Sequence, residues 1–287
     1  MLIFYGFLVF GVLFLIYMYL ENFNLQVTNY AISSKGIPNA FDDVSFVVLA
    51  DLHNNSFGRD NERLINKINK ANPNFIVIAG DLIVGKEQGD FSVALSLMEK
   101  LTKQYPVYYG FGNHEQRVME DGTHHDESFN SYIRKLKDMG VRVINNETCT
   151  IYRKESKINI TSVEIGKEYF QKFKKTKMET EYLQKLVGIP DNKCYNILIA
   201  HNPIYFKTYI NWGADLVLSG HLHGGIVRLP WLGGVISPQY ELFPKYDAGE
   251  FHENGQTMLV SRGLGTHTIK LRAFNRPELM VVTLKRP

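Results

Sequence analysis

The sequence predicts an α/β domain in which two mixed β-sheets pack together and helices lie outside them. Three observations lead to this class. In the first half of the chain, short runs rich in Val, Ile and Leu alternate with segments of helical period. Toward the C-terminus, strand-like runs follow one another directly. The runs are continuously apolar, which is typical of strands buried on both faces.

The N-terminal segment predicts a membrane helix. Residues 2–20 carry no charge, and at about 1.5 Å per residue they span roughly 30 Å, the thickness of the hydrocarbon layer. Tyr17 and Tyr19 lie near one end, where interfacial aromatic residues are expected. A cleaved signal peptide and a buried core helix are the alternatives. No Lys or Arg precedes the run, no small-residue cleavage site follows it and no face of it is polar, which favours an uncleaved anchor over residues 1–21.

We therefore expect a single-pass protein of the cell membrane. The side of the membrane on which the domain lies stays open, because Lys35 is the only nearby basic residue and the positive-inside rule has little to count. Residues 22–43 resemble a connector, with an extended stretch at 25–32 and a turn-prone Gly36-Ile37-Pro38-Asn39. One domain is expected over residues 44–287, a length within the range of single α/β domains.

The expected elements alternate along this domain. Strands at 44–50, 74–79 and 107–111 are continuous apolar runs. The helix near 60–71 is predicted by Leu64, Ile65, Ile68 and Ala71, and the helix near 91–104 by Val93, Ala94, Leu97, Met98 and Leu101. The later elements are a helix near 129–139, strands at 141–145, 148–153 and 157–165, a Lys-rich helix near 168–187, and strands at 195–200, 215–219, 257–262 and 278–284.

Composition argues against several classes of function. The 32 basic and 29 acidic residues nearly balance at a net charge of +3, so no nucleic-acid partner is expected. The two cysteines, Cys149 and Cys194, lack the spacing of a cysteine zinc site and are too few for a disulfide scaffold.

Polar residues that bind metals follow five of the expected strands. In open α/β sheets, ligands gather beyond the carboxyl ends of the strands, so these side chains are expected to meet in one crevice. Seven oxygen and imidazole ligands are too many for one ion and enough for two. The seven are Asp51, His53, Asp81, Asn113, His201, His221 and His223.

Spacing supports this convergence. Asp51 and His53 are two residues apart on a segment expected to be extended, so both side chains would leave the same face; His221 and His223 stand in the same relation.

Asp81 is the natural bridge between two cations because it stands alone at its strand end. Gly80, Gly112 and Gly220 remove side-chain bulk where the backbones would converge. Two-metal sites hold ions roughly 3.5–4 Å apart and clamp the attacking and leaving oxygens of an in-line displacement. A water between two cations would supply hydroxide near neutral pH.

Each fragment also has a structural interpretation. Gly80-Asp81 is common in turns, Asn113 suits a left-handed turn, and His201-Asn202-Pro203 can begin a helix. Five such coincidences at five strand ends favour a metal site.

Together, these motifs resemble those of the calcineurin-like metallophosphoesterase family, in order and spacing along residues 44–225. They are Asp51-x-His53, Gly80-Asp81, Gly112-Asn113-His114-Glu115, His201 and Gly220-His221-x-His223. The segments Gly220–Pro230 and Ser261–Gly265 resemble, more narrowly, its membrane-anchored bacterial branch. Many relatives carry a second acid three residues after the bridging Asp, where this chain has Val84.

The resemblance implies a four-layer α/β/β/α sandwich of two mixed sheets and a dinuclear site. By position, it implies that Asp51, His53, Asp81 and His223 hold one metal and that Asp81, Asn113, His201 and His221 hold the other. His114 would be the unligated histidine that contacts the phosphate and protonates the leaving oxygen. The mixed nitrogen and oxygen ligands suit two divalent ions of Mn, Fe, Zn or Ni, without choosing among them.

The function so implied is that of a membrane-anchored, metal-dependent phosphohydrolase in which metal-bound hydroxide attacks phosphorus. A phosphodiesterase, a phosphomonoesterase and a pyrophosphatase are all compatible, and lipid-linked or cell-envelope molecules lead as substrates. An enzyme acting on soluble nucleotides is one alternative, and a non-catalytic anchored binding module on the same fold is another. The filled ligand positions favour an enzyme. The oligomeric state stays open.

Three further features bear on the substrate. The apolar loop at 229–238 either contacts an acyl chain or membrane, or folds onto the core. The five lysines of Lys167–Lys177 either meet anionic headgroups or form a solvated helix face. Arg262 either binds phosphate or forms a structural ion pair.

Overall fold

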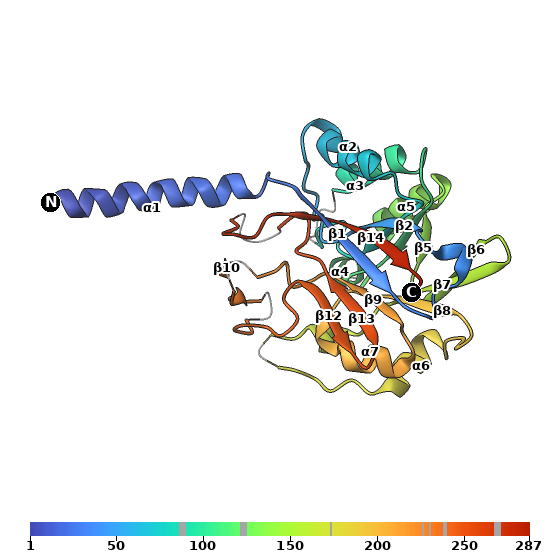
Figure 1. The fold of residues 1–287 in the computed structure, drawn as a ribbon. Coiled ribbons are helices and arrows are strands. Elements are labelled where there is room, and N and C mark those ends of the chain that lie inside the picture. Colours follow the sequence, from blue (N-terminus) through green and yellow to red (C-terminus); the bar gives the residue numbers. More distant parts are fainter. Residues whose placement is uncertain are drawn as a thin grey trace.

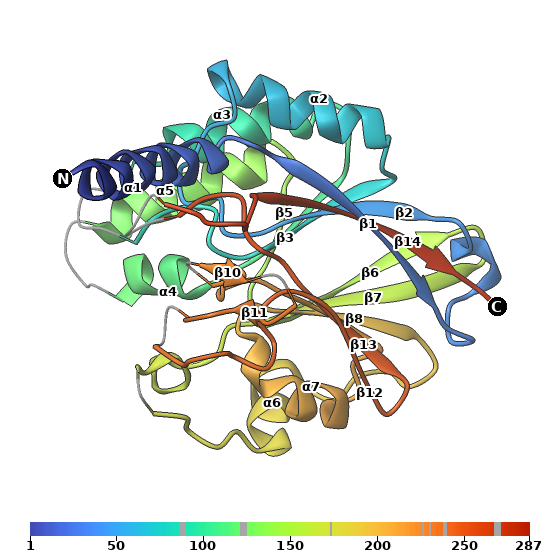
Figure 2. The ribbon, with the colours of Figure 1, turned by 60° about the vertical axis from the view of Figure 1, so that its left-hand side comes forward.

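The computed structural model describes residues 1–85, 90–120, 125–172, 174–225, 227–229, 231–237, 240–266 and 271–287. A long helix, α1 (Leu2–Glu21), projects from a domain in which two six-stranded sheets lie between helices (Figure 1). Seen from another side, the domain has four layers (Figure 2). The helices α2 (Glu62–Ala71), α3 (Ser92–Leu101) and α5 (His125–Asp138) cover the first sheet, and α6 (Thr180–Val187) and α7 (Phe206–Trp212) cover the second. The predicted sandwich of two mixed sheets is confirmed.

The first sheet has the strand order β1-β14-β2-β3-β4-β5. The strands β2 to β5 are mutually parallel, and β14 is antiparallel to β2. The extended stretch expected before the domain forms β1, which pairs in parallel with β14 at the edge of the sheet. The bounds are β1 (Gln26–Ser33), β14 (Glu278–Lys285), β2 (Ser45–Leu49), β3 (Phe75–Ala79), β4 (Val107–Gly110) and β5 (Arg142–Ile144).

The second sheet has the order β12-β13-β9-β8-β7-β6. Its four central strands are parallel, and an antiparallel strand closes each edge. The bounds are β12 (Gly249–Glu253), β13 (Gln256–Val260), β9 (Leu216–Ser219), β8 (Tyr195–Ala200), β7 (Ser156–Val163) and β6 (Glu147–Arg153).

The continuous apolar runs follow from this layering, because both faces of each central strand are buried. In β2, Val47 and Leu49 pack with the outer helices, while Phe46 and Val48 lie in the core between the sheets. This alternation leaves β2 no solvent-facing side and hence no polar period.

The helix expected near 168–187 is largely wrong. Only Thr180–Val187 is α-helical, and a short 3₁₀ helix spans Lys167–Phe170. Residue 173 lies outside the described residues, and its neighbours up to 179 form no regular element. Lysines at 172, 174, 175 and 177 would repel one another on a helix and supply no apolar face. The structure also adds a helix that the pattern did not predict, α4 (Asn113–Glu120), directly after β4.

Candidate metal centre

The loops that follow β2, β3, β8 and β9 meet at one end of the two sheets. The Asp51 amide donates to the Gly80 carbonyl, which extends the pairing of β2 with β3. The Gly220 amide donates to the His201 carbonyl and does the same for β9 and β8. Across the two sheets, the His221 amide donates to Asp51 Oδ1 at 3.0 Å. The strand ends therefore converge as the sequence predicts.

The predicted site residues form three overlapping groups whose ligand atoms lie within 4.8 Å of one another. Two of the groups share His53 and two share Asp81, so the three together make one centre. Asn113, the remaining predicted ligand, has a buried Oδ1 that accepts no hydrogen bond within the described part of the chain. The groups are Asp51, His53 and His223; His53, Asp81 and His114; and Asp81, His201 and His221.

The two carboxylates face the imidazoles at short range. His201 Nε2 lies 3.1 Å from Asp81 Oδ2 and 3.6 Å from Asp51 Oδ1. His223 Nε2 lies 3.5 Å from Asp51 Oδ1, and His53 Nε2 lies 3.8 Å from an oxygen of each carboxylate. All five side chains are buried. Buried charges require partners or a metal ion, which this arrangement can provide.

Three of the histidines can present a lone pair to the centre when their rings are neutral. His53, His201 and His223 place Nδ1 3.3, 2.8 and 3.0 Å from the carbonyl oxygens of Ile83, Ala79 and Gly265, respectively. A carbonyl oxygen can only accept, so Nδ1 carries the proton and the neutral ring leaves Nε2 unprotonated. This is the tautomer that metal-binding histidines adopt when a backbone carbonyl orients them.

With these tautomers, the geometry fits a cation. The Nε2 atoms of His53 and His223 lie 3.2 Å apart, so two lone pairs face each other. Likewise, His201 Nε2 faces a carboxylate oxygen of Asp81. Such acceptor pairs are repulsive unless a proton or a metal ion lies between them. The donor set therefore forms a divalent metal site.

His114 has the opposite tautomer. The amide of Gly85 donates to its Nδ1 at 2.8 Å. An amide can only donate, so this nitrogen is unprotonated and the neutral ring carries its proton on Nε2, 3.9 Å from Asp81 Oδ2. The neutral ring of His114 thus offers the centre a donor, whereas the neutral rings of His53, His201 and His223 offer lone pairs.

Left-handed turns, rather than extended segments, aim the ligands. The sequence predicts extended backbone for Asp51 with His53 and for His221 with His223. This expectation is wrong, because all four residues have positive φ. Such a conformation costs a non-glycine residue about 1–3 kcal/mol and persists only where the surroundings impose it. The φ values are 51° at Asp51, 48° at His53, 54° at Asp81, 69° at His221 and 53° at His223.

Two glycines allow this close approach. A Cβ at Gly112 would overlap Asp81 Oδ1, and a Cβ at Gly80, where φ is 88°, would lie 2.6 Å from His201 Nδ1. Neither neighbour can move without leaving the centre.

Burial and neighbouring charges shift the pKa values of the centre. Burial raises the pKa of Asp51 to about 7, against the opposing charge of His201. Burial would also raise the pKa of Asp81, but His201, His114 and His53 hold it well below its usual value. Burial would lower the pKa of His201, but Asp81 and Asp51 raise it to about 10.

We expect divalent-cation binding to release at least one proton at pH 7. The pKa of His201 is raised in the metal-free protein, so the ring is protonated at every pH below about 10 and must lose its proton to become a ligand. Release should therefore decline as pH rises toward 10. Calorimetric titration with Mn²⁺ in two buffers of different ionisation enthalpy measures it. Equal heats in both buffers would contradict the expectation.

Glu115 holds the loops of the centre together, a role that the sequence pattern did not indicate. Its buried carboxylate accepts the amides of Asp81, Leu82 and Gly112 at 2.8–2.9 Å and the hydroxyl of Tyr109 at 2.7 Å. It thereby fixes the loops after β3 and β4 to each other. The one available signal was its place directly after His114.

Two residues near the C-terminus support His223. The buried side chain of Arg272 donates to the Gly265 carbonyl at 2.8 Å, and this carbonyl also faces His223 Nδ1. The side-chain Nδ2 of Asn275 donates to the His223 carbonyl at 2.7 Å. No sequence pattern pointed to either residue. Arg262, by contrast, lies 3.1 Å from Glu278 and forms the structural ion pair that was one of its two interpretations.

Comparisons with known proteins agree with this geometry. A family model described as calcineurin-like phosphoesterase matches residues 44–225. The uncharacterized metallophosphoesterase YkuE of Bacillus subtilis is 28% identical over 274 residues, covering 93% of this chain and 88% of YkuE. The phosphodiesterase YaeI of Escherichia coli is 26% identical over 212 residues, covering 74% of this chain and 70% of YaeI.

Two further comparisons have lower sequence identity. A transmembrane protein with metallophosphoesterase domain from Danio rerio is 24% identical, covering 91% of this chain and 57% of its own length. Among solved structures, the phosphopantetheinyl hydrolase of Mycobacterium tuberculosis aligns with a TM-score of 0.47 and 12% identity, covering 81% of this chain and 96% of that one.

The family model covers more than half of the chain and includes every strand end that contributes to the centre. This chain therefore belongs to the calcineurin-like phosphoesterase family and is a metal-dependent phosphoesterase.

Proposed function

We propose that the chain is a membrane-anchored phosphohydrolase that uses two divalent cations to hydrolyse a phosphate monoester, diester or pyrophosphate of a lipid-linked or cell-envelope molecule. The observation that carries the hydrolytic part is the division of the histidines. When neutral, the rings of His53, His201 and His223 present Nε2 lone pairs to the centre, whereas the neutral ring of His114 presents an Nε2 proton. A site that only held metal would not need a histidine that presents a proton to the centre.

In this proposal, Asp81 would be the ligand shared by the two cations. Its Oδ2 faces imidazoles of both ligand sets, and its Oδ1 is held by the His114 amide at 2.8 Å. The first set is Asp51, His53, Asp81 and His223, and the second is Asp81, Asn113, His201 and His221. Nitrogen and oxygen donors suit Mn, Fe, Zn or Ni. When bound, two such cations neutralise charge on the phosphoryl oxygens and activate water for attack on phosphorus.

The protein's own task is to hold these groups and to move one proton. His114, oriented by the Gly85 amide, donates from Nε2 to the leaving oxygen. Glu115 keeps the loops of Asp81 and Gly112 in register, so the proton donor and the bridging carboxylate keep their separation. The side chains of Leu82 and Ile83, just beyond Asp81, are buried in the hydrophobic core and anchor the loop that carries it.

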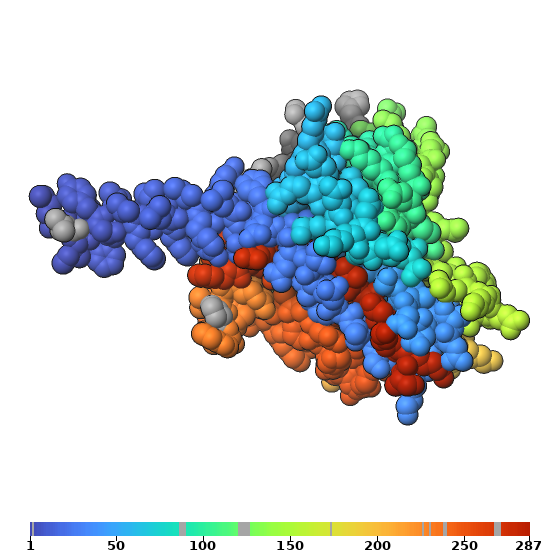
Figure 3. All heavy atoms as spheres, turned by 45° about the horizontal axis from the view of Figure 1, so that its top comes forward, coloured from blue at the N-terminus to red at the C-terminus, as the bar shows by residue number. Residues whose placement is uncertain are grey.

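The membrane part of the proposal is supported by α1. Among the described residues, Ile3–Glu21 is long and apolar enough to cross a bilayer, with a mean hydropathy of 2.3. Most of this helix is exposed and stands clear of the domain, unlike a core helix (Figure 3). We assign residues 1–21 to the anchor, 22–43 to the connection and 44–287 to the phosphoesterase domain.

The test uses the full-length protein in detergent with bis-p-nitrophenyl phosphate. Turnover should require Mn²⁺ or another divalent ion, vanish with EDTA and return when metal is restored. No turnover with any divalent metal would favour the non-catalytic binding module. Panels of phospholipids, lipid-linked nucleotide sugars and free nucleotides then test the substrate class. The highest kcat/KM on free nucleotides would refute the lipid assignment and leave the hydrolytic one intact.

A further inference from the structure

Large apolar side chains gather on one side of the domain, near β10 (Arg228–Leu229) and β11 (Gly233–Gly234). We call them the docking face: Leu229, Trp231, Leu232, Tyr240, Leu242, Phe243 and Phe274, all of them exposed. Trp231 is fully exposed, and Leu232 is 66% exposed. Beyond α1, the described residues have only Phe23, Tyr152 and Ile189 as other large exposed hydrophobic side chains. Such a concentrated patch marks an interaction site.

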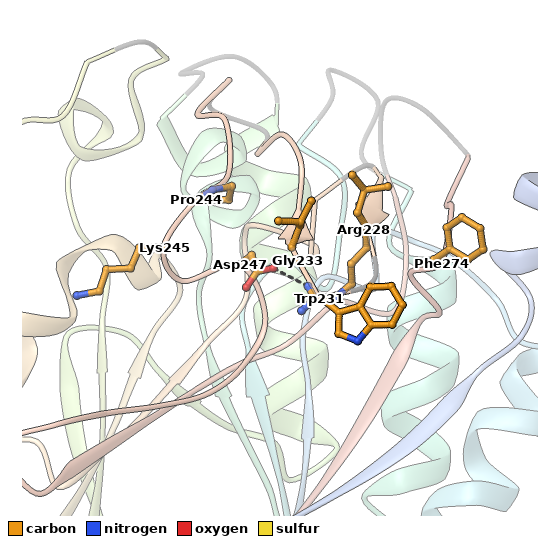
Figure 4. A pocket seen from close by; sticks show the side chains of 9 residues that line it. Arg228, Trp231, Gly233, Pro244, Lys245, Asp247 and Phe274 are labelled. Atoms are coloured by element: carbon orange, nitrogen blue, oxygen red, sulfur yellow. Dashed lines mark hydrogen bonds and ion pairs between the residues drawn. The ribbon is translucent and has the colours of Figure 1, made fainter.

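Hydrogen bonds hold this face in shape. The strands β10 and β11 pair with each other, and the Arg228 amide donates to the Ala273 carbonyl at 3.0 Å. The Phe243 amide donates to the Val235 carbonyl at 2.9 Å. Asp247 accepts from the Arg228 side chain at 2.7 Å, beside Trp231 (Figure 4). The alternative interpretation of the loop at 229–238, in which it folds onto the core, is wrong for Trp231 and Leu232, because both side chains are exposed. Positions 230 and 238 lie outside the described residues.

The docking face is continuous with α1. The ring of Phe274 lies 5.6 Å from that of Tyr17 and 6.4 Å from that of Phe14, centroid to centroid. The Phe274 amide also donates to the Tyr17 hydroxyl at 3.3 Å. Phe14 precedes Glu21, the first charged residue, by about 10 Å of helix. If α1 crosses a bilayer, Phe274 therefore lies at the boundary between headgroups and acyl chains, where interfacial elements are buried by roughly 5–10 Å.

Strand directions place the metal centre on the same side. The chain enters β1 directly after α1, so β1 starts at the anchored side and runs away from it. The strand β14 is parallel to β1 and antiparallel to β2, so β2 and its parallel neighbours end back at the side of α1. Figure 1 shows β10 on this side too. Asp51 and Asp81 follow β2 and β3, and Arg228 follows His223 by five residues.

Basic residues accompany the apolar side chains. A hollow of about 440 Å³ is lined by Leu229, Trp231, Leu232 and Phe274, by Lys245, and by Arg228 with its ion-pair partner Asp247. Lys172 lies 4.9 Å from the centre of the Tyr240 ring. Aromatic and aliphatic groups beside basic ones are typical of surfaces that enter the interface of an anionic bilayer.

We propose that the docking face inserts into the same bilayer as α1, so that the centre opens at the membrane surface and receives phosphate esters of membrane lipids. This inference rests on the proposed function. It adds a second membrane contact to the anchor and names membrane lipids as the substrate class. The occupant is a bilayer containing anionic phospholipid, since the patch adjoins a membrane helix and carries basic residues.

The two tryptophans of the chain provide a direct test. Trp231 is on the docking face, whereas Trp212 is buried in α7 and donates to the Gly188 carbonyl. Full-length Trp212→Phe and Trp231→Phe variants are reconstituted into vesicles of phosphatidylcholine and phosphatidylglycerol with brominated acyl chains. Trp212→Phe, which keeps Trp231, should lose most of its emission relative to vesicles without bromine. Trp231→Phe, the matched control, should be unquenched.

Failure of the docking inference is separable from failure of the proposed function. If Trp231 is unquenched while the reconstituted protein hydrolyses bis-p-nitrophenyl phosphate with Mn²⁺, the docking inference alone is overturned. Cross-linked dimers in that sample would assign the docking face to a second copy of the chain. Quenched Trp231 without turnover would support docking and overturn the hydrolytic function. A protein that an alkaline carbonate wash removes from the vesicles would overturn both the anchor and the docking face.

Discussion

Replacing Asp81 with asparagine is expected to remove most of the bound metal and to lower activity by more than about 10²-fold, beyond what the loss of an outer-shell partner costs. The amide keeps the size of the side chain but removes the charge that faces His201 at 3.1 Å and His53 at 3.8 Å. If Asp81 bridges two ions, both ligand sets are damaged at once. Metal content per chain by mass spectrometry and kcat on bis-p-nitrophenyl phosphate measure the effect.

The matched control is Asp60→Asn, which neutralises an exposed carboxylate that pairs only with Lys100 among the described contacts. It should keep metal and activity. Thermal unfolding of Asp81→Asn without metal shows whether the fold survives, and its melting temperature should be lower than that of the metal-free wild type, because the protonated His201 loses its buried partner. Full metal occupancy in Asp81→Asn would show that another residue bridges the ions.

His114→Ala is expected to retain its metal and to lose rate by ~10²–10⁴, the usual contribution of a general acid. The ring accepts from the Gly85 amide through Nδ1, so Nε2 carries the transferable proton. Its removal withdraws a donor and leaves the three lone-pair histidines in place. Metal content and kcat, measured on the same preparations, give the two readouts.

The leaving group sharpens this test. An alkyl phosphodiester needs protonation of its leaving oxygen, whereas p-nitrophenolate leaves without it. The loss of rate should therefore be larger for the alkyl ester. His252→Ala, which removes a largely exposed ring near Glu250, serves as the control and should leave both rates unchanged. Metal loss in His114→Ala would mean that the ring is a ligand, and equal rate losses on both esters would argue against proton donation.

The strands were predictable from the sequence because burial on both faces makes them continuously apolar. Ser45–Leu49, Phe75–Ala79 and Tyr195–Ala200 match the expected runs to within a residue. That the residues of the centre lie together was also predictable, because polar residues that bind metals follow five of these strands, although each fragment by itself has a structural interpretation. The sequence could therefore indicate which residues meet.

How those residues meet was not predictable. The left-handed turns at Asp51 and His221 depend on contacts with other loops, such as the His221 amide on Asp51 Oδ1. The tautomer of His114 depends on the Gly85 amide, 29 positions away in the chain. The support from Arg272 reaches His223 through a shared carbonyl. Interactions of this kind leave no local pattern in the sequence.

The most direct test of the central claim is anomalous diffraction from crystals of the full-length protein soaked in Mn²⁺. The account predicts two anomalous peaks, roughly 3.5–4 Å apart, on either side of the Asp81 carboxylate. One peak should be bounded by Asp51, His53 and His223, and the other by His201, His221 and Asn113. A map with no anomalous peak beside Asp81 would contradict the account.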